Sequence, residues 1–94
     1  MQKSTHTPEY AALRARLTAI RAAAAMSQRD LAARLRVPHS WVAKVEAGER
    51  RIDLIEFGWF CSACGASPAE EAANVLAAAR ANGSGRGGRT LGRR

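Results

Sequence analysis

Residues 27–48, SQRDLAARLRVPHSWVAKVEAG, decide the fold that we predict for this chain. The stretch predicts two short helices separated by a tight turn. Ser27 is a suitable N-cap, and Asp30 places a carboxylate at the positive end of the first helix. Pro38 disfavours a helical conformation at the residue before it, so a second helix begins at about Pro38. Gly48 then provides a C-cap for that second helix.

The second helix has two chemically different sides. Val42 and Val45 form its apolar side, and three residues form the apolar side of the first helix: Leu31, Ala32 and Leu35. The opposite side of the second helix carries small, polar and basic residues: His39, Ser40, Ala43, Lys44 and Ala47. Two short helices, a turn and such an outer face are typical of a helix-turn-helix.

At these residues the chain resembles the xenobiotic-response-element class of bacterial and phage regulators, which includes the lambda and Cro repressors. The next segment, ERRIDLIEF at residues 49–57, resembles a common branch of that class. The resemblance covers about residues 13–80. It implies an all-α fold, a compact five-helix lambda-repressor-like domain that binds double-stranded DNA and represses transcription. The chain departs from the class at Arg36, where many members have Gly, so Arg36 is either left-handed or part of a differently shaped turn.

Length and composition divide the chain into three parts. Ninety-four residues allow one small domain, which we place at residues 7–82. Residues 1–6 are polar and are expected to be disordered. Residues 83–94, GSGRGGRTLGRR, are expected to form a flexible basic tail, because Gly, Ser and Arg bury little apolar surface. The sequence leaves open whether this tail adds phosphate contacts or has no role.

Capping residues and apolar spacing predict the first helix. Thr7 and Pro8 begin it, and it runs to about Ala25. Its apolar stripe is Tyr10, Leu13, Leu17, Ile20 and Ala24. Arg14 and Arg16 lie off that stripe, which favours a solvated face.

Two further helices follow the helix-turn-helix. Asp53 caps one that runs from Leu54 to about Cys64, with Ile55, Trp59 and either Phe60 or Ala63 predicted to face the core, helped by Leu54 and Gly58. The last helix begins at Ser67-Pro68 and ends at Asn82-Gly83. Its apolar stripe is the candidate dimer surface: Ala72, Val75, Leu76 and Ala79.

The outer residues of the recognition helix, residues 38–47, are the candidates for reading DNA bases. In this motif the first residues of the second helix contact base edges in the major groove. The candidates for base contact are His39, Ser40, Trp41 and Lys44. Trp41 can instead close the top of the core. The class often has Gln or Arg in place of His39, so its base preference does not transfer.

A second group of residues is expected to contact phosphates. By resemblance, Gln28 grips the DNA backbone with its side-chain amide at the first turn of its helix. Arg29, Arg50 and Arg51 flank the same surface, where each is either a phosphate contact or a solvated charge. The net charge of +7 favours a polyanionic partner. Outside the tail, however, eleven basic residues face eight acidic ones, so the placement of charge matters more than its sum.

One ion pair is expected to be structural. The resemblance implies that Arg21 near the end of the first helix pairs with Glu46. A carboxylate near a helix C-terminus is unfavourable to the helix dipole, and a bidentate guanidinium contact would offset that effect.

The sequence predicts no catalytic residues, no cofactor and no metal. Cys61 and Cys64 form a lone C-x-x-C, whereas a structural zinc site needs four ligands, so buried and inert thiols are expected. The sequence contains no recognisable set of a nucleophile, a base and an orienting group. No glycine-rich loop follows a predicted strand. The chain is therefore not predicted to be an enzyme.

The partners expected by resemblance are a palindromic operator and a second copy of the chain, as a homodimer. No segment has the length of a signal peptide or a membrane span, which favours a cytoplasmic bacterial or phage protein. The alternative function is an antitoxin or adaptor module of the same fold, with a protein partner such as a toxin.

Overall fold

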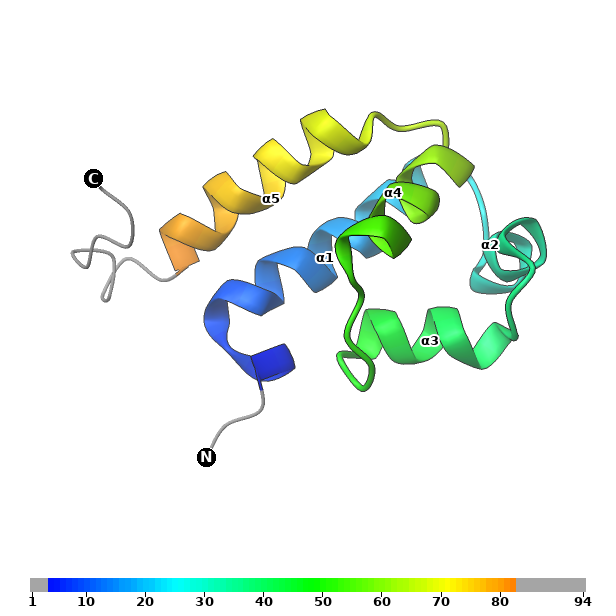
Figure 1. Cartoon of the computed structure of the whole chain (residues 1–94), viewed down its shortest axis with the longest axis horizontal. Coiled ribbons are helices and arrows are strands. Elements are labelled where there is room, and N and C mark those ends of the chain that lie inside the picture. The colour runs from blue at the N-terminus through cyan, green and yellow to red at the C-terminus, as the bar shows by residue number, and fades with distance from the viewer. Residues whose placement is uncertain (1–3, 83–94) are drawn as a thin grey trace.

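The computed structural model describes residues 4–82 and places helices along almost all of them (Figure 1). A short 3₁₀ turn, η1, comes first, at Ser4–His6. The α-helices are α1 (Pro8–Ala23), α2 (Gln28–Leu35), α3 (His39–Ala47), α4 (Leu54–Ala63) and α5 (Pro68–Asn82). Within this described range there is no strand, so the all-α, five-helix prediction is confirmed.

Local capping chemistry accounts for where the helices begin. The Ser27 hydroxyl accepts a hydrogen bond from the Asp30 amide, and the Asp30 carboxylate accepts one from the Ser27 amide. Asp53 and Glu56 form the same reciprocal pair of bonds at the start of α4. The Thr7 hydroxyl accepts from the Tyr10 amide in the same way. Each cap satisfies backbone N–H groups that have no partner inside the helix.

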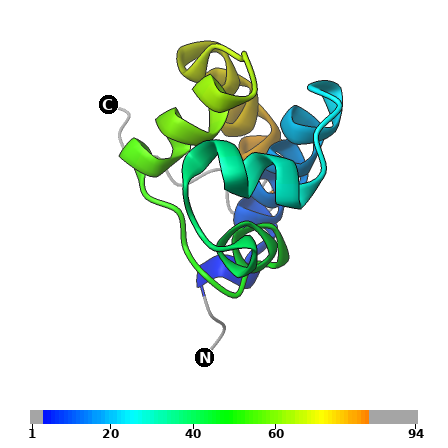
Figure 2. The same ribbon diagram turned by 90° about the vertical axis from the view of Figure 1, so that its right-hand side faces the viewer.

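The core lies where α1 to α5 converge. Its members are residues with at most 8% of their surface exposed, and the largest fully buried ones are Phe60, Leu17, Leu31, Val42, Val45 and Cys61. α1 and α5 run side by side, α2 and α3 form the helix-turn-helix, and α4 packs on the rest (Figures 1 and 2). Every helix therefore contributes to one core.

The prediction for the inward face of α4 was right for Phe60 but wrong for Ile55 and Trp59. Ile55 and Trp59 are both 61% exposed, whereas Phe57, Phe60 and Cys61 are buried. Residues 54–63, LIEFGWFCSA, have apolar side chains on every side of the helix, so apolar spacing does not identify one face. Packing selected the face that carries the two phenylalanines.

The predicted dimer surface on α5 also needs correction. Val75 is buried and Ala72 and Ala79 are half-buried, because α5 packs against α1 within the same chain. Of that stripe only Leu76 remains exposed. The stripe as a whole is thus part of the domain rather than a free surface.

Arg16 is more than the solvated charge that was predicted, because its side chain is 40% exposed and also forms an ion pair. Arg16 Nε lies 2.5 Å from Glu71 Oε1 and Arg16 Nη2 lies 3.1 Å from Glu71 Oε2, a bidentate pair that joins α1 to α5. Arg14 is half-buried and lies against Gly48, where a Cβ atom would stand 2.8 Å from Arg14 Cδ.

The prediction that residues 1–6 are disordered was wrong for residues 4–6. Residues 4–6 form η1 instead of being disordered, and Thr5 is buried, because this turn packs on the end of α3 beside Gly48. Residues 1–3 and the predicted tail at residues 83–94 lie outside the described range.

Candidate nucleic-acid interface

The turn between α2 and α3 has the left-handed form. Arg36 has φ 61° and ψ 44°, and its amide donates to Ala33 O at 3.3 Å. The Val37 amide donates to Ala32 O at 3.0 Å, which closes the C-terminus of α2. An L-residue in this conformation is strained, since its Cβ crowds the following carbonyl. The chain thus closes α2 with a left-handed C-cap residue, a position that commonly holds glycine, although the residue here is Arg36.

α3 begins at His39, directly after Pro38, and exposes a polar face. His39, Ser40 and Lys44 are exposed, while Val42 and Val45 on the opposite side are fully buried. Lys44 follows Ser40 by one helical turn and therefore shares its face, and His39 precedes Ser40 at the start of the helix. These groups offer hydrogen-bond donors and acceptors at the spacing of one helical turn.

Trp41 occupies the boundary between that face and the core. It is half-buried and packs against the core, and the Arg50 guanidinium lies 5.1 Å from the centroid of its ring. That distance is within the range of a cation–π contact. The arrangement favours the packing alternative for Trp41 over base contact.

Arg50 is held by several groups of its own chain. It donates from Nη1 and Nη2 to the two carboxylate oxygens of Glu56, each at 3.1 Å, and from Nη1 to Arg51 O at 2.7 Å. Hydrogen bonding to Glu56 raises the pKa of Arg50, and the same bond lowers the pKa of Glu56. The sequence alone did not reveal this pair, because Glu56 was assigned only to the cap of α4. The conformation of the loop between α3 and α4, rather than a helical spacing, brings Glu56 close to Arg50.

The other phosphate candidates differ in their surroundings. Arg29 is exposed in the first turn of α2. Arg51 is exposed, and its guanidinium lies 5.8 Å from the centroid of the Tyr10 ring. Gln28 is half-buried and donates from Nε2 to Glu46 Oε1 at 3.0 Å. Its amide nitrogen therefore has a partner in the chain, which the sequence did not indicate.

The expected pair of Arg21 and Glu46 is present. Arg21 Nε lies 2.7 Å from Glu46 Oε2 and Arg21 Nη2 lies 2.9 Å from Glu46 Oε1, a fork with 16% and 5% of the two side chains exposed. Arg21 Nη1 also donates to Met26 O, at 2.9 Å. Burial raises the pKa of the Glu46 carboxyl, but hydrogen bonds from Arg21 and Gln28 outweigh it and leave that pKa lowered. One carboxylate thus ties the end of α3 to α1 and to the start of α2.

The cysteines lie away from the exposed face of α3. Cys61 is fully buried, and burial raises the pKa of its thiol to about 11. Cys64 is half-buried, and burial raises its pKa also. Both are free thiols. Across residues 4–82, no three His, Cys, Asp or Glu side chains gather as a metal site would require.

No helix among the described residues combines the length and the apolar character needed to cross a membrane.

Comparison with known proteins agrees with this geometry. Residues 12–74 match the model of a helix-turn-helix domain family. The chain is also similar to a solved structure titled XRE-family like protein from Pseudomonas syringae pv. tomato str. DC3000, with 43% sequence identity and a TM-score of 0.70. That match covers 73% of this chain and 84% of the other. A search of the curated proteins found no match.

Proposed function

The chain belongs to the XRE family of helix-turn-helix proteins, which bind DNA and are not enzymes, and we propose that it is a sequence-specific repressor of transcription. α3 enters the major groove of an operator, and α2 braces it across the DNA backbone. The observation that carries this proposal is the exposed face of α3, where His39, Ser40 and Lys44 lie together opposite a buried apolar side.

Each residue of that face has a distinct role in the proposal. Lys44 donates to the O6 and N7 acceptors of a guanine, and Ser40 donates or accepts at a neighbouring base. His39 donates to a base edge or a phosphate. Trp41 contributes by closing the core beneath this face, since it is half-buried under Arg50.

Phosphate contacts supply most of the affinity in the proposal. Arg29 and Arg51 are exposed and cationic, and the N-terminus of α2 offers backbone N–H groups beside Gln28. Arg50 shares its donors with Glu56, so a phosphate would compete with that carboxylate for it.

We further propose that two copies bind paired half-sites. Operators of this geometry place the half-sites about 34–36 Å apart, one helical turn, so both recognition helices meet the same face of the DNA. The relative is bacterial, which supports a location in the cytoplasm of a bacterium or of a phage-infected cell, where such an operator lies.

An antitoxin or adaptor function would favour a broad apolar face on α3. Its outer residues are instead polar, basic or small, and Trp41 is half-buried. This composition supports DNA rather than a protein as the ligand of α3.

The deciding experiment is selection from a random-sequence duplex pool at two salt concentrations, followed by sequencing. An enriched palindrome whose affinity falls steeply with salt is the expected result. Binding without enrichment would reduce the proposal to non-specific association, and no binding would refute it.

A further inference from the structure

α4 exposes large apolar side chains that its own chain does not cover. Leu54 is 75% exposed, and Ile55 and Trp59 are each 61% exposed. Leu76 on α5 is 66% exposed. Single exposed apolar residues are ordinary on a protein surface, whereas a contiguous patch marks an interaction site.

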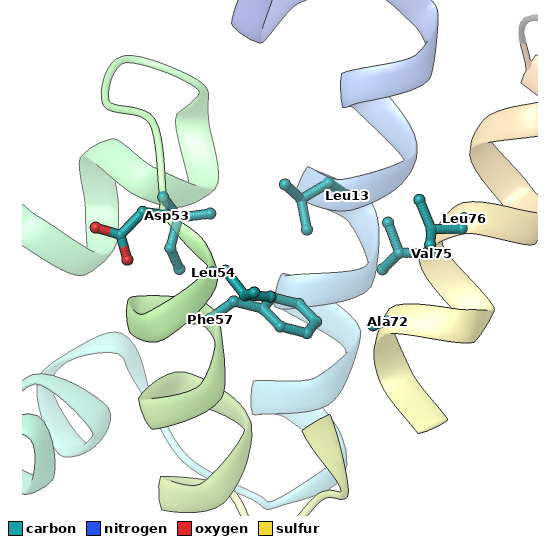
Figure 3. Close-up of a pocket in the computed structure, with 8 residues that line it drawn as sticks. Leu13, Asp53, Leu54, Phe57, Ala72, Val75 and Leu76 are labelled. Atoms are coloured by element: carbon teal, nitrogen blue, oxygen red, sulfur yellow. The ribbon is translucent and has the colours of Figure 1, made fainter. Parts of the chain in front are cut away.

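These residues form one contiguous surface. Positions 54, 55, 58 and 59 lie on adjoining rows of a helix, so Leu54, Ile55, Gly58 and Trp59 cover one side of α4. Leu54 and Leu76 border the same groove of about 290 Å³, whose floor includes Leu13 and Phe57 (Figure 3). We call Leu54, Ile55, Gly58, Trp59 and Leu76 together the α4 patch.

Gly58 is the second feature that indicates a contact on this side of α4. It lies in the middle of α4, where glycine is among the least favourable residues. A Cβ atom built on it would meet nothing within 4 Å, so no contact inside the chain requires a glycine there. A glycine does allow another backbone or a bulky side chain to approach the helix closely.

Charge narrows the choice of partner. Glu56 is the charged residue of α4 and lies one turn before Trp59, and Arg50 pairs with its carboxylate, so the ion pair at the edge of the patch adds no net charge. The patch itself carries no charge on a chain with a net charge of +7. Like-charged copies can meet only where charge is absent, whereas an acidic partner would gain nothing from this surface.

The area of the patch suits a small symmetric dimer. Four large side chains of about 200 Å² each, roughly two-thirds exposed, offer about 500 Å² per copy. Two copies would then bury about 1,000 Å² in total, the lower bound for a specific interface. A two-fold axis near Gly58 makes the contact self-complementary, with Ile55 and Trp59 of each copy beside Gly58 of the other.

We propose that the α4 patch is the interface between two copies of this chain. The inference rests on the proposed function, because it supplies the symmetry that paired half-sites require. The patch residues belong to α4 and α5, whereas the proposed DNA-reading residues belong to α3, so the two surfaces share no residue. Both can be occupied together.

The test measures the monomer–dimer equilibrium of the full chain by sedimentation over a range of micromolar concentrations. Gly58→Arg blocks close approach at open space, so the monomer should fold as before, which circular dichroism checks. Ala19→Arg adds the same side chain to an exposed site on α1 and is the matched control. We expect the dimer dissociation constant to rise at least tenfold in Gly58→Arg and to stay unchanged in Ala19→Arg.

A second readout does not depend on that variant. In a Trp41→Phe background Trp59 is the remaining tryptophan, and its emission should shift to shorter wavelength as the chain is concentrated. Wild type that stays monomeric both free and on the enriched duplex would overturn the inference. So would a dimer in which Gly58→Arg and Ala19→Arg behave alike. Failure of the wild type to bind any duplex would instead count against the proposed function.

Discussion

Glu46 shows how one residue can hold the helix-turn-helix together. Its carboxylate accepts from Arg21 on α1 and from Gln28 on α2, while its backbone belongs to α3. Removing one partner of a buried ion pair leaves the other charge without compensation, which is far more costly than losing a surface pair.

Glu46→Ala should therefore destabilise the domain. We expect a loss of about 3 kcal/mol in the free energy of unfolding, the lower end of the range for a buried pair, because Arg21 keeps some exposure. Thermal and urea denaturation measure the loss. Glu49→Ala, an exposed carboxylate in the following loop, is the control and should change stability by less than about 0.5 kcal/mol. Equal melting of the two variants would contradict a structural role for the pair.

The same pair predicts a pH dependence. Because the folded-state pKa of Glu46 lies below its ordinary value of 4.5, its contribution is present above that value and is lost as pH falls through the folded pKa. The difference in melting temperature between wild type and Glu46→Gln should thus shrink below pH 4.5. A difference that is constant with pH would show that ionised Glu46 contributes nothing.

Lys44 should govern specificity rather than general affinity. Lys44→Ala is expected to weaken operator binding by about 1–3 kcal/mol and to relax discrimination at one base pair. Arg29→Ala, at an exposed phosphate candidate, should weaken binding to all sequences evenly. Fluorescence anisotropy with operator and single-substitution duplexes separates these patterns. Even weakening by Lys44→Ala would remove it from base recognition.

Cys61 should be inert to alkylation in the native protein. Its thiol is fully buried and its pKa is raised to about 11, so little thiolate exists at neutral pH. Iodoacetamide followed by peptide mass spectrometry should find Cys61 unmodified in native protein and modified in denaturant. Rapid native modification would show instead that the thiol is accessible and reactive.

At the scale of elements, the turn before α3 is locally strained yet well formed. Arg36 accepts a left-handed conformation because its backbone N–H and that of Val37 bond to carbonyls of α2. These bonds close α2 and set the point where α3 begins. The strain arises because an arginine, rather than a glycine, takes the left-handed conformation, while the hydrogen bonds of the turn are formed.

Arg36→Gly should consequently stabilise the domain. Removing the Cβ crowding at φ 61° is expected to add about 1 kcal/mol to the free energy of unfolding. Arg36→Ala is the matched control, since it removes the side chain but keeps the Cβ, and it should not stabilise. Urea denaturation compares the two. Equal stability of the two variants would mean that the strain is negligible.

At the scale of the whole molecule, charged and apolar side chains are assigned to different contacts. Arg29 on α2 and Arg51 in the loop after α3 are exposed, while the α4 patch consists of uncharged side chains. This division lets DNA binding respond to salt while an apolar contact between copies does not.

The salt dependence of operator binding can be predicted from this arrangement. If Arg29, Arg50 and Arg51 of two copies each neutralise one phosphate, the slope of log K against log salt is roughly −5. Arg51→Ala should make it shallower by about 2, because one contact is lost from each copy. Anisotropy titrations in increasing salt measure both. A slope near zero would exclude these contacts.

The sequence by itself determined the helices and the motif. Caps such as Ser27 and Asp53, the break at Pro38 and the stop at Gly48 act within a few residues, so they can be read without a structure. The buried side of α3 was equally predictable, because Val42 and Val45 stand against polar neighbours. The Arg21–Glu46 pair was accessible only through resemblance.

The tertiary structure decided which apolar face each outer helix uses. α4 is apolar on all sides, so only packing could bury Phe57 and Phe60 and leave Ile55 and Trp59 in solvent. The partners in the pairs Arg16–Glu71 and Arg50–Glu56 are brought together by the path of the chain. No helical spacing in the sequence predicts either pair. Local chemistry sets where an element begins and ends, whereas its exposed surface depends on which neighbours fill the core.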